Sequence, residues 1–204
     1  MDDDDDKARM AAGTRLVAVP VKRPRKAQVL NLPHNIIRTE RVGNDMMVNG
    51  YHDDSGLNMT LVGLGKSAAI TSSLFLERRY ESEGRSHAFN AMVEADGSGL
   101  IGVPTVGAEW ESGRYVWRSD SSDISFVTKA TAGTLNSAGA LAATPKDKVA
   151  THPDYRCEVS CIDWYGNSRP IFTGGRIFGL MGTALVEAEM AEGKVREKAR
   201  IDLT

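Results

Sequence analysis

Hydrophobic residues alternate with polar ones over short runs along most of this chain, and glycine, asparagine, aspartate or proline interrupts each run. Alternation with a period of two is typical of β-strands, whereas a helix repeats its apolar residues every three or four positions. The runs "HNIIRTERV" and "MMVNGY" are separated by Gly43, Asn44 and Asp45. These residues tolerate positive φ, so the pair predicts a β-hairpin. The pattern as a whole predicts an all-β protein.

The clearest hairpin signal is Asp96-Gly97, which separates "SHAFNAMVEA" from "LIGVPTV". Three more strands are expected at "GRYVWRS", "SDISFVTKA" and "GTLNSAGALA", and another at "YRCEVSCIDWY". The segment "IFTGGRIFGLMG" predicts a strand or a pair of strands, and Glu192-Gly193 predicts the last turn.

The C-terminal segment "TALVEAEMAEGKVREKARIDL" contains many helix-favouring residues. A helix would have to bring Leu185, Met190 and Val195 onto one face, and their spacing of five fits the helical repeat poorly. Gly193 would also interrupt it. Strict alternation places Val186 and Met190 on one face of a strand, so the strand interpretation is favoured.

The predicted strands fall into three groups of about four, at residues 34–80, 86–143 and 155–203. Groups of this size and spacing are typical of β-propeller blades. We therefore expect one β-propeller-like domain over residues 13–204, with about three four-stranded blades. Closed propellers typically need at least four blades. Three explanations are open: N-terminal blades are missing, residues 14–33 complete a blade across the closure, or chains pair to close the ring.

Two stretches resemble a known family: "RIFGLMGTALVEAEM" followed by "GKVREKARIDLT", and "MVEADGSGLIGVPTV" followed by "SDISFVTKATAGTLNSAGAL". They are similar to the C-terminal blades of bacterial secreted β-propeller proteins, which are distantly similar to WD-type repeats. The resemblance spans about residues 34–204, although the WD dipeptide itself is absent. It implies an extracytoplasmic (periplasmic or secreted) binding or scaffolding module, and it supplies no catalytic residues.

Charge and composition narrow the range of partners. The net charge is -2, so no basic field favours nucleic acid as a partner. The dense cationic run "VKRPRK" is interrupted by Pro24 and predicts a turn or linker. No apolar run approaches the length of about 18–20 residues needed for a membrane helix, and the acidic N-terminus does not have the pattern of a signal peptide.

The first residues, "MDDDDDKARM", contain "DDDDK", which resembles the enteropeptidase recognition site used in expression vectors. Residues 1–12 are therefore expected to be a leader introduced with a vector or a natural acidic tail that self-repulsion keeps disordered.

One motif partly matches a nucleotide-binding P-loop and another partly matches a metal site, but both matches are poor. A P-loop would need glycine where "TLVGLGKS" has Thr60, and a helix where the following residues predict a strand. His52, Asp53 and Asp54 could ligate a metal only in a loop, because neighbouring strand residues face apart. A hairpin turn and acidic turn residues are the favoured interpretations, so neither cofactor nor metal is expected.

Catalytic patterns are equally sparse. The chain has no G-x-S-x-G motif. A carboxylate pair for a propeller-fold hydrolase of glycans or esters could come from Glu94, Asp96, Glu109, Glu111, Asp120, Asp123, Glu158 and Asp163. This hydrolase is the alternative to the favoured, non-enzymatic module.

Aromatic residues and arginine dominate the energetics of interfaces. The predicted binding residues are Arg85, Trp110, Tyr115 and Trp117, while Trp164 is expected in the core. They indicate a protein or ligand partner. Self-association, or a self-assembling structural subunit, is the further alternative, because an open arc of blades would expose strand edges.

Cys157 and Cys161 would share one face of a strand, about 13 Å apart. A disulfide needs Cα atoms within about 7 Å, so a bond between this candidate pair requires a bulge or turn. The spacing does not match C-x-x-C chemistry. A disulfide here would indicate an oxidising compartment.

Overall fold

The computed structural model describes residues 14–52, 55–84, 86–111, 114–143, 168–182 and 184–203. The prediction of an all-β protein is confirmed, because these residues form fifteen strands and only two short 3-10 turns, η1 (Pro24–Lys26) and η2 (Ser86–Ala88). None of the described residues belongs to a helix long and apolar enough to cross a bilayer.

The strands form four antiparallel sheets, which follow one another along the chain. Sheet 1 contains β1 (Thr14–Ala18) and β2 (Gln28–Leu32). Sheet 2 contains β3 (Arg38–Val42), β4 (Asp45–Tyr51), β5 (Gly56–Leu64) and β6 (Ala68–Glu77). Sheet 3 contains β7 (Arg79–Glu81), β8 (Asn90–Val93), β9 (Gly99–Glu111), β10 (Arg114–Lys129) and β11 (Leu135–Ala142). Sheet 4 contains β12 (Arg169–Thr173), β13 (Arg176–Met181), β14 (Ala184–Ala191) and β15 (Lys194–Asp202).

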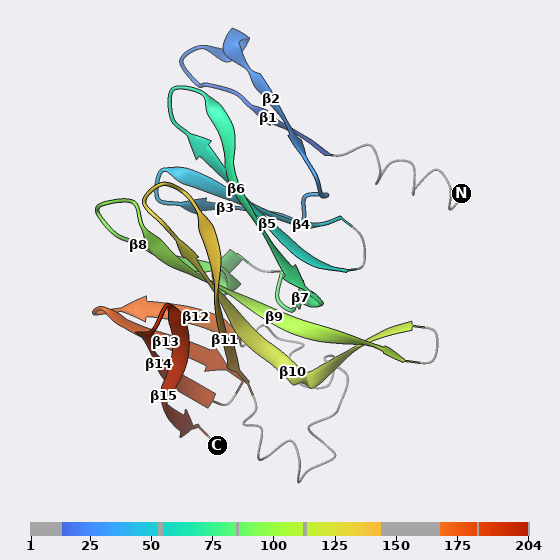
Figure 1. The fold of residues 1–204 in the computed structure, drawn as a ribbon, viewed down its shortest axis with the longest axis vertical. Helices are drawn as coiled ribbons and strands as arrows, with labels where there is room; N and C mark the ends of the chain where they lie inside the picture. Colours follow the sequence, from blue (N-terminus) through green and yellow to red (C-terminus); the bar gives the residue numbers. More distant parts are fainter. Residues whose placement is uncertain are drawn as a thin grey trace.

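The sheets stack face on face, from sheet 1 at one end of the molecule to sheet 4 at the other (Figure 1). A separate apolar core lies in each of the three spaces between them. The core between sheets 1 and 2 contains the buried residues Leu32, Val48 and Val62. The core between sheets 2 and 3 contains Val42, Met47, Leu57, Met59, Leu61, Phe89, Ile101, Val103, Val127 and Leu135. The core between sheets 3 and 4 contains Leu100, Ile124, Phe126, Ala138, Leu141, Ile177, Met181, Val186, Ala188 and Val195.

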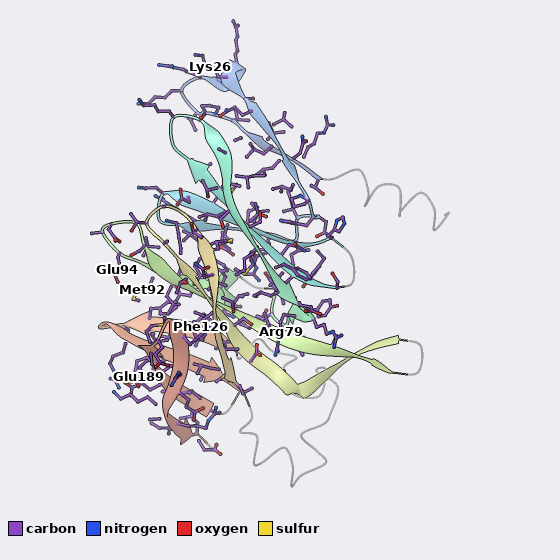
Figure 2. The ribbon with its side chains drawn as sticks, in the orientation of Figure 1. Lys26, Arg79, Met92, Glu94, Phe126 and Glu189 are labelled. Atoms are coloured by element: carbon purple, nitrogen blue, oxygen red, sulfur yellow. The ribbon has the colours of Figure 1, made fainter. Side chains whose placement is uncertain are left out.

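The burial pattern of each strand follows from its place in the stack. Sheet 2 has a neighbour on both faces, so Met47 packs toward sheet 3 while the next residue, Val48, packs toward sheet 1. Sheet 1 has a neighbour on one face only, and β1 alternates between partly buried and exposed positions. Figure 2 shows Phe126 between sheets 3 and 4, where its ring meets the edge of Phe172 at a centroid distance of 6.4 Å.

The predicted groups correspond closely to sheets 2, 3 and 4, which span residues 38–77, 79–142 and 169–202. The predicted turns are confirmed by positive φ angles of 61° at Gly43, 84° at Gly97, and 51° and 73° at Glu192 and Gly193. The strand prediction for the C-terminal segment is also confirmed, since Val186 and Ala188 are buried on one face of β14.

One strand assignment was wrong. "GRYVWRS" and "SDISFVTKA" were expected as two strands, but both belong to β10. The register of β10 against β9 shifts between Trp117 and Ser122. A β-bulge absorbs extra residues without ending a strand, and here it takes up the polar residues that suggested a break.

The described residues form no closed ring of sheets. Within them, β1 pairs with β2 alone, and sheet 4 consists of its own four strands. Residues 14–32 therefore form a separate sheet at the opposite end of the stack (Figure 1), and they do not complete sheet 4.

Candidate functional site

The hairpin of β9 and β10 extends beyond the rest of sheet 3. The pairing of β7 with β9 reaches Gly107, and the pairing of β11 with β10 begins at Asp123. Within the described residues, 108–111 and 114–117 pair only with each other. The two strands therefore project from the stack as an arm (Figure 1). We call this two-stranded extension, residues 108–111 and 114–117, the β-arm.

The register of the β-arm brings the predicted aromatic residues together. Tyr115 is directly opposite Trp110, and Trp117 is directly opposite Ala108. Directly opposed residues of an antiparallel pair share a face, and so do residues two positions apart on one strand. Trp110, Tyr115 and Trp117 therefore occupy positions on the same face of the β-arm. The sequence predicted the three residues individually, and the register adds that they share a face.

A buried ion pair lies where the β-arm leaves the sheet. The side chain of Asp123 is 7% exposed, and its Oδ2 lies 2.6 Å from Nη1 of Arg79 on β7. Thr105 on β9 donates its hydroxyl hydrogen to Oδ1 of Asp123, and the hydroxyl of Ser125 lies 2.6 Å from that of Thr105. Figure 2 shows Arg79 close to the base of the β-arm. These contacts join β7, β9 and β10 at one point.

Burial and charge act in opposite directions on Asp123. Burial raises the pKa of its carboxyl group, because removal from water disfavours the charged form. The positive charge of Arg79 and the hydroxyl groups of Thr105 and Ser125 lower the pKa, but burial has the larger effect. Asp123 thus depends on Arg79 for compensation of its charge.

A second buried ion pair attaches β7 to sheet 2. Nε of Arg38 on β3 donates to Oε2 of Glu81 at 2.9 Å, and Nδ2 of Asn49 donates to Oε1 of Glu81 at 2.5 Å. The backbone N–H of Glu81 donates to the hydroxyl of Tyr51 at 2.9 Å, and Nη2 of Arg38 donates to the carbonyl of Glu83 at 2.7 Å. Burial raises the pKa of Glu81 and raises the pKa of Tyr51 to about 12.

The two ion pairs explain how a strand of three residues keeps a fixed position. β7 spans only Arg79–Glu81, yet it is tied through Arg79 to β10 and through Glu81 to β3 and β4. Loss of one partner from a buried ion pair typically costs about 3–5 kcal/mol, because the other charge is left uncompensated. The base of the β-arm is therefore held by sheet 2 as well as by its own sheet.

Several predicted residues lie outside the described part of the chain. They are Arg85 among the binding residues, both cysteines Cys157 and Cys161, Trp164, and the carboxylates Asp53, Asp54, Glu158 and Asp163. The structure provides no contact for any of them, so the disulfide and the core position of Trp164 stay predictions.

The hairpin interpretation of the P-loop-like segment is confirmed. Lys66 and Ser67 lie in the turn between β5 and β6, and a strand follows them where a P-loop requires a helix. His52 follows the end of β4. The described residues contain no group of three His, Cys, Asp or Glu side chains arranged to hold a metal.

The proposed carboxylates of a hydrolase lie in different surroundings where they are described. Asp96 is in the exposed β8–β9 turn, where it accepts hydrogen bonds from Ser98 and Thr131. Asp123 is buried against Arg79. Within the part of the chain that the structure describes, Glu40 and Glu81 both contact Arg38, and neither was among the predicted set. Strand alternation could have placed Arg38 and Glu40 on one face, but it contained no signal for Glu81.

The cationic run "VKRPRK" forms the tip of sheet 1, around η1, which confirms the prediction of a turn. Its residues Lys22, Arg23 and Lys26 line a groove of about 510 Å³, together with Lys66 from the β5–β6 turn. Figure 2 shows Lys26 at this end of the molecule.

No protein-family model, curated protein or solved structure matches this chain. The resemblance to secreted β-propeller proteins therefore stays a prediction, and the function is inferred from the β-arm and the ion pairs at its base.

Proposed function

We propose that this protein is a non-enzymatic binding or scaffolding module that contacts a protein or ligand through the aromatic face of its β-arm. The observation that carries the proposal is the register of β9 and β10, which gives Trp110, Tyr115 and Trp117 one common face. Tryptophan and tyrosine combine a large apolar area with a polar group, and they are enriched among the residues that dominate binding energy.

The buried ion pairs support this function by fixing the arm before a partner arrives. Arg79 and Glu81 hold the base of the β-arm against two different sheets. Binding costs less conformational entropy when the contact surface is ordered in advance. A braced hairpin is therefore better suited to recognition than a hairpin with a loose base.

We also propose that the stacked sheets are an arc of a β-propeller-like domain, completed by a partner segment or by further chains. Three successive meanders of similar size pack face on face, which supports this arrangement. The extracytoplasmic location is proposed on the family resemblance alone. Titration of free thiols tests it, since two reactive groups in the native secreted protein would contradict an oxidised Cys157–Cys161 pair.

The β-arm proposal is tested with two sets of substitutions. The first replaces Trp110, Tyr115 and Trp117 by alanine, and the matched control replaces Glu109 and Val116, which are opposite each other on the other face. All three proteins are screened against the same peptide and glycan arrays. We expect the aromatic variant to lose the binding of the unmodified protein by at least about tenfold, the effect of roughly 1.4 kcal/mol, while the control keeps it.

Both variants should keep the thermal midpoint of the unmodified protein, because the substituted residues lie where β9 and β10 pair with no other described strand. Equal binding by the aromatic variant and the unmodified protein would overturn the proposal. Failure of the unmodified protein to bind any member of the arrays would also count against it.

A self-assembling subunit is the second candidate, and it is favoured by the outer edge of β1, which pairs with no described strand. Sedimentation velocity over a range of protein concentrations distinguishes the two functions. A monomer at high concentration would contradict self-assembly and leave the β-arm proposal intact.

A further inference from the structure

Sheet 1 has two strands, whereas each of the other sheets has at least four. The contacts between sheets show which two positions are filled. The last strands of successive sheets lie beside one another: β2 contacts β6, β6 contacts β11, and β11 contacts β15. β2 therefore occupies the position of a last strand, and β1 occupies the position before it, equivalent to β5, β10 and β14.

The described residues consequently leave two strand positions of sheet 1 unfilled. The equivalent positions contain β3 and β4 in sheet 2, and β12 and β13 in sheet 4. The empty positions adjoin the outer edge of β1. No described strand pairs with this edge, so its backbone N–H and C=O groups have no ladder partner among the described residues.

The face of sheet 2 beneath these positions is hollow. A groove of about 610 Å³ lies over β3 and β4, toward the end of β5. Its lining residues are Thr39, Glu40, Arg41, Asn44, Asp45, Met46, Leu64 and Gly65. Met46 extends from the groove to the core between sheets 1 and 2, and Leu64 is 47% exposed. The apolar core thus ends at the edge of β1, although β3 and β4 continue beyond it.

We propose that the outer edge of β1 is a strand-addition site for a β-hairpin of another polypeptide, which pairs antiparallel to β1 and covers the groove over β3 and β4. The completed sheet would have four strands, like sheets 2 and 4. Strand addition combines backbone hydrogen bonds to an exposed edge with pockets for alternate side chains. This site lies on sheet 1 and is independent of the β-arm.

The site determines the chemistry of the incoming hairpin. Each strand should be about five residues long to match β1, with apolar residues at alternate positions facing Met46 and Leu64. An acidic residue belongs at the end where Arg41 lines the groove, whereas Asp45 is already paired with Lys129 at 3.1 Å. Residues 1–13 fit poorly, because five of them are consecutive aspartates.

The chain itself provides a suitable probe. A synthetic peptide of residues 168–182 contains β12 and β13 with their Gly-Gly turn, the hairpin that fills the two equivalent positions in sheet 4. The control peptide carries Ile177→Pro and Leu180→Pro, since proline cannot donate a hydrogen bond within a strand ladder. Binding of each labelled peptide to the full chain is measured by fluorescence anisotropy, and protection of the chain by hydrogen–deuterium exchange.

We expect the unmodified peptide to bind saturably and to slow amide exchange in β1, β3 and β4, while the proline peptide does neither. Leu64→Glu should weaken binding by at least about tenfold, because it places a charge beside the apolar side of the groove. The matched control is Ile201→Glu, a similarly exposed residue on β15 at 58% exposure. This control should leave binding unchanged.

Four results would overturn the proposal. The first is absence of binding up to the solubility limit of the peptide. The second is faster amide exchange in β12 and β13 without protection of β1, which would indicate that the peptide replaces these strands in sheet 4. The third is protection, in the free monomer, of the β1 amides that point away from β2, which would show that a segment of the same chain already fills the site. The fourth is protection of β1 that appears only with dimer formation, which would identify a second copy as the occupant.

Discussion

Gly50 lies where the segment before β3 crosses β4. The backbone N–H groups of Asn35 and Ile37 donate to the carbonyls of Tyr51 and Asn49, which draws this segment onto the strand. A Cβ atom at position 50 would overlap the carbonyl oxygen of Asn35 and lie 2.6 Å from Nδ1 of His34. Glycine at this position permits the close approach.

We therefore expect Gly50→Ala to lower the free energy of unfolding by about 3 kcal/mol, the upper range for forced overpacking. Urea denaturation measures the change. Gly65→Ala is the matched control, because a Cβ there would meet no atom within 4 Å, and it should change stability by less than about 0.5 kcal/mol. Equal effects of the two substitutions would show that the crossing at Gly50 relaxes easily.

Glu81 makes the stability of the protein depend on pH. Burial raises its pKa above the ordinary value of 4.5, so the folded protein retains this proton to a higher pH than the unfolded chain. Between these two pKa values the folded state binds more protons. The free energy of unfolding therefore falls as pH rises through this window.

Glu81→Gln should remove this contribution. The glutamine oxygen can still accept from Arg38. Nδ2 of Asn49 now donates to Glu81, so the Asn49 amide must turn over before its Oδ1, which has no hydrogen-bond partner among the described residues, can accept from the glutamine amide. We expect the urea midpoint of the variant, relative to that of the unmodified protein, to increase as pH rises from 4.5 toward neutrality. Asp123, whose pKa is also raised, is present in both proteins and cancels from the difference. A pH-independent difference would contradict this assignment.

The polar residues of the site show where prediction from sequence reached its limit. Trp110, Tyr115 and Trp117 were assigned to binding from residue type alone, because aromatic residues dominate the energetics of interfaces, and that assignment stays a prediction. Glu81 and Asp123 compensate charges on Arg38 and Arg79, and 43 residues separate the first pair. Strand periodicity is local, so it contains no information about such pairings between strands that are distant in the sequence.

At the scale of the element, β7 couples the β-arm to sheet 2. Arg79→Met removes the cation beside Asp123 and leaves a buried carboxylate without its main charge partner. We expect a loss of about 2 kcal/mol, below the range for fully buried pairs because Arg79 is 34% exposed. Amide exchange in residues 105–111 should accelerate more than exchange in β14.

The control for this substitution is Arg176→Met on sheet 4. Arg176 contacts Glu187 at 2.8 Å, but it is 59% exposed, so solvent screens the pair. Its loss should lower stability much less than the loss of Arg79 and should leave exchange in the β-arm unchanged. If Arg79→Met loosened sheet 4 as much as residues 105–111, the ion pair would act on global stability and would not brace the arm specifically.

The strands could be predicted well wherever the turn between them contains a residue that favours a positive φ angle, such as glycine. Gly43, Gly97 and Gly193 adopt positive φ angles, and each lies in the turn between two consecutive strands. β10 was missed as a single strand because a bulge and a turn use similar polar residues, and only pairing with β9 distinguishes them.

At the scale of the whole molecule, the order of sheets 2, 3 and 4 followed from the sequence, but sheet 1 was not predicted as a separate sheet and the relative placement of the four sheets was not predicted. Alternation shows that a strand has an apolar face, and sheet 2 needs two such faces because it lies between neighbours. Closure depends on contacts between the ends of the stack, and the local pattern of a strand is independent of them. The expectation of a propeller-like arc thus remains part of the proposal.

The stack also predicts unequal consequences for the loss of its two ends. Sheet 4 shares a core of ten buried residues with sheet 3, whereas sheet 1 shares a core of three with sheet 2. In a stack held by nearest-neighbour interfaces, removal of an end sheet costs the energy of its one interface. A chain without residues 1–32 should therefore fold, with its thermal midpoint lowered by a few degrees.

A chain ending at Ala143 should behave differently. It would expose the sheet 3 side of the larger core, with Leu100, Ile124, Phe126, Ala138 and Leu141 open to solvent. Exposed apolar surface of this kind favours aggregation. We expect strong binding of the dye ANS and loss of the monomer peak in size-exclusion chromatography, neither of which should occur without residues 1–32. Similar behaviour of the two truncated chains would show that the stack unfolds as one unit and that the difference between its interfaces does not determine its stability.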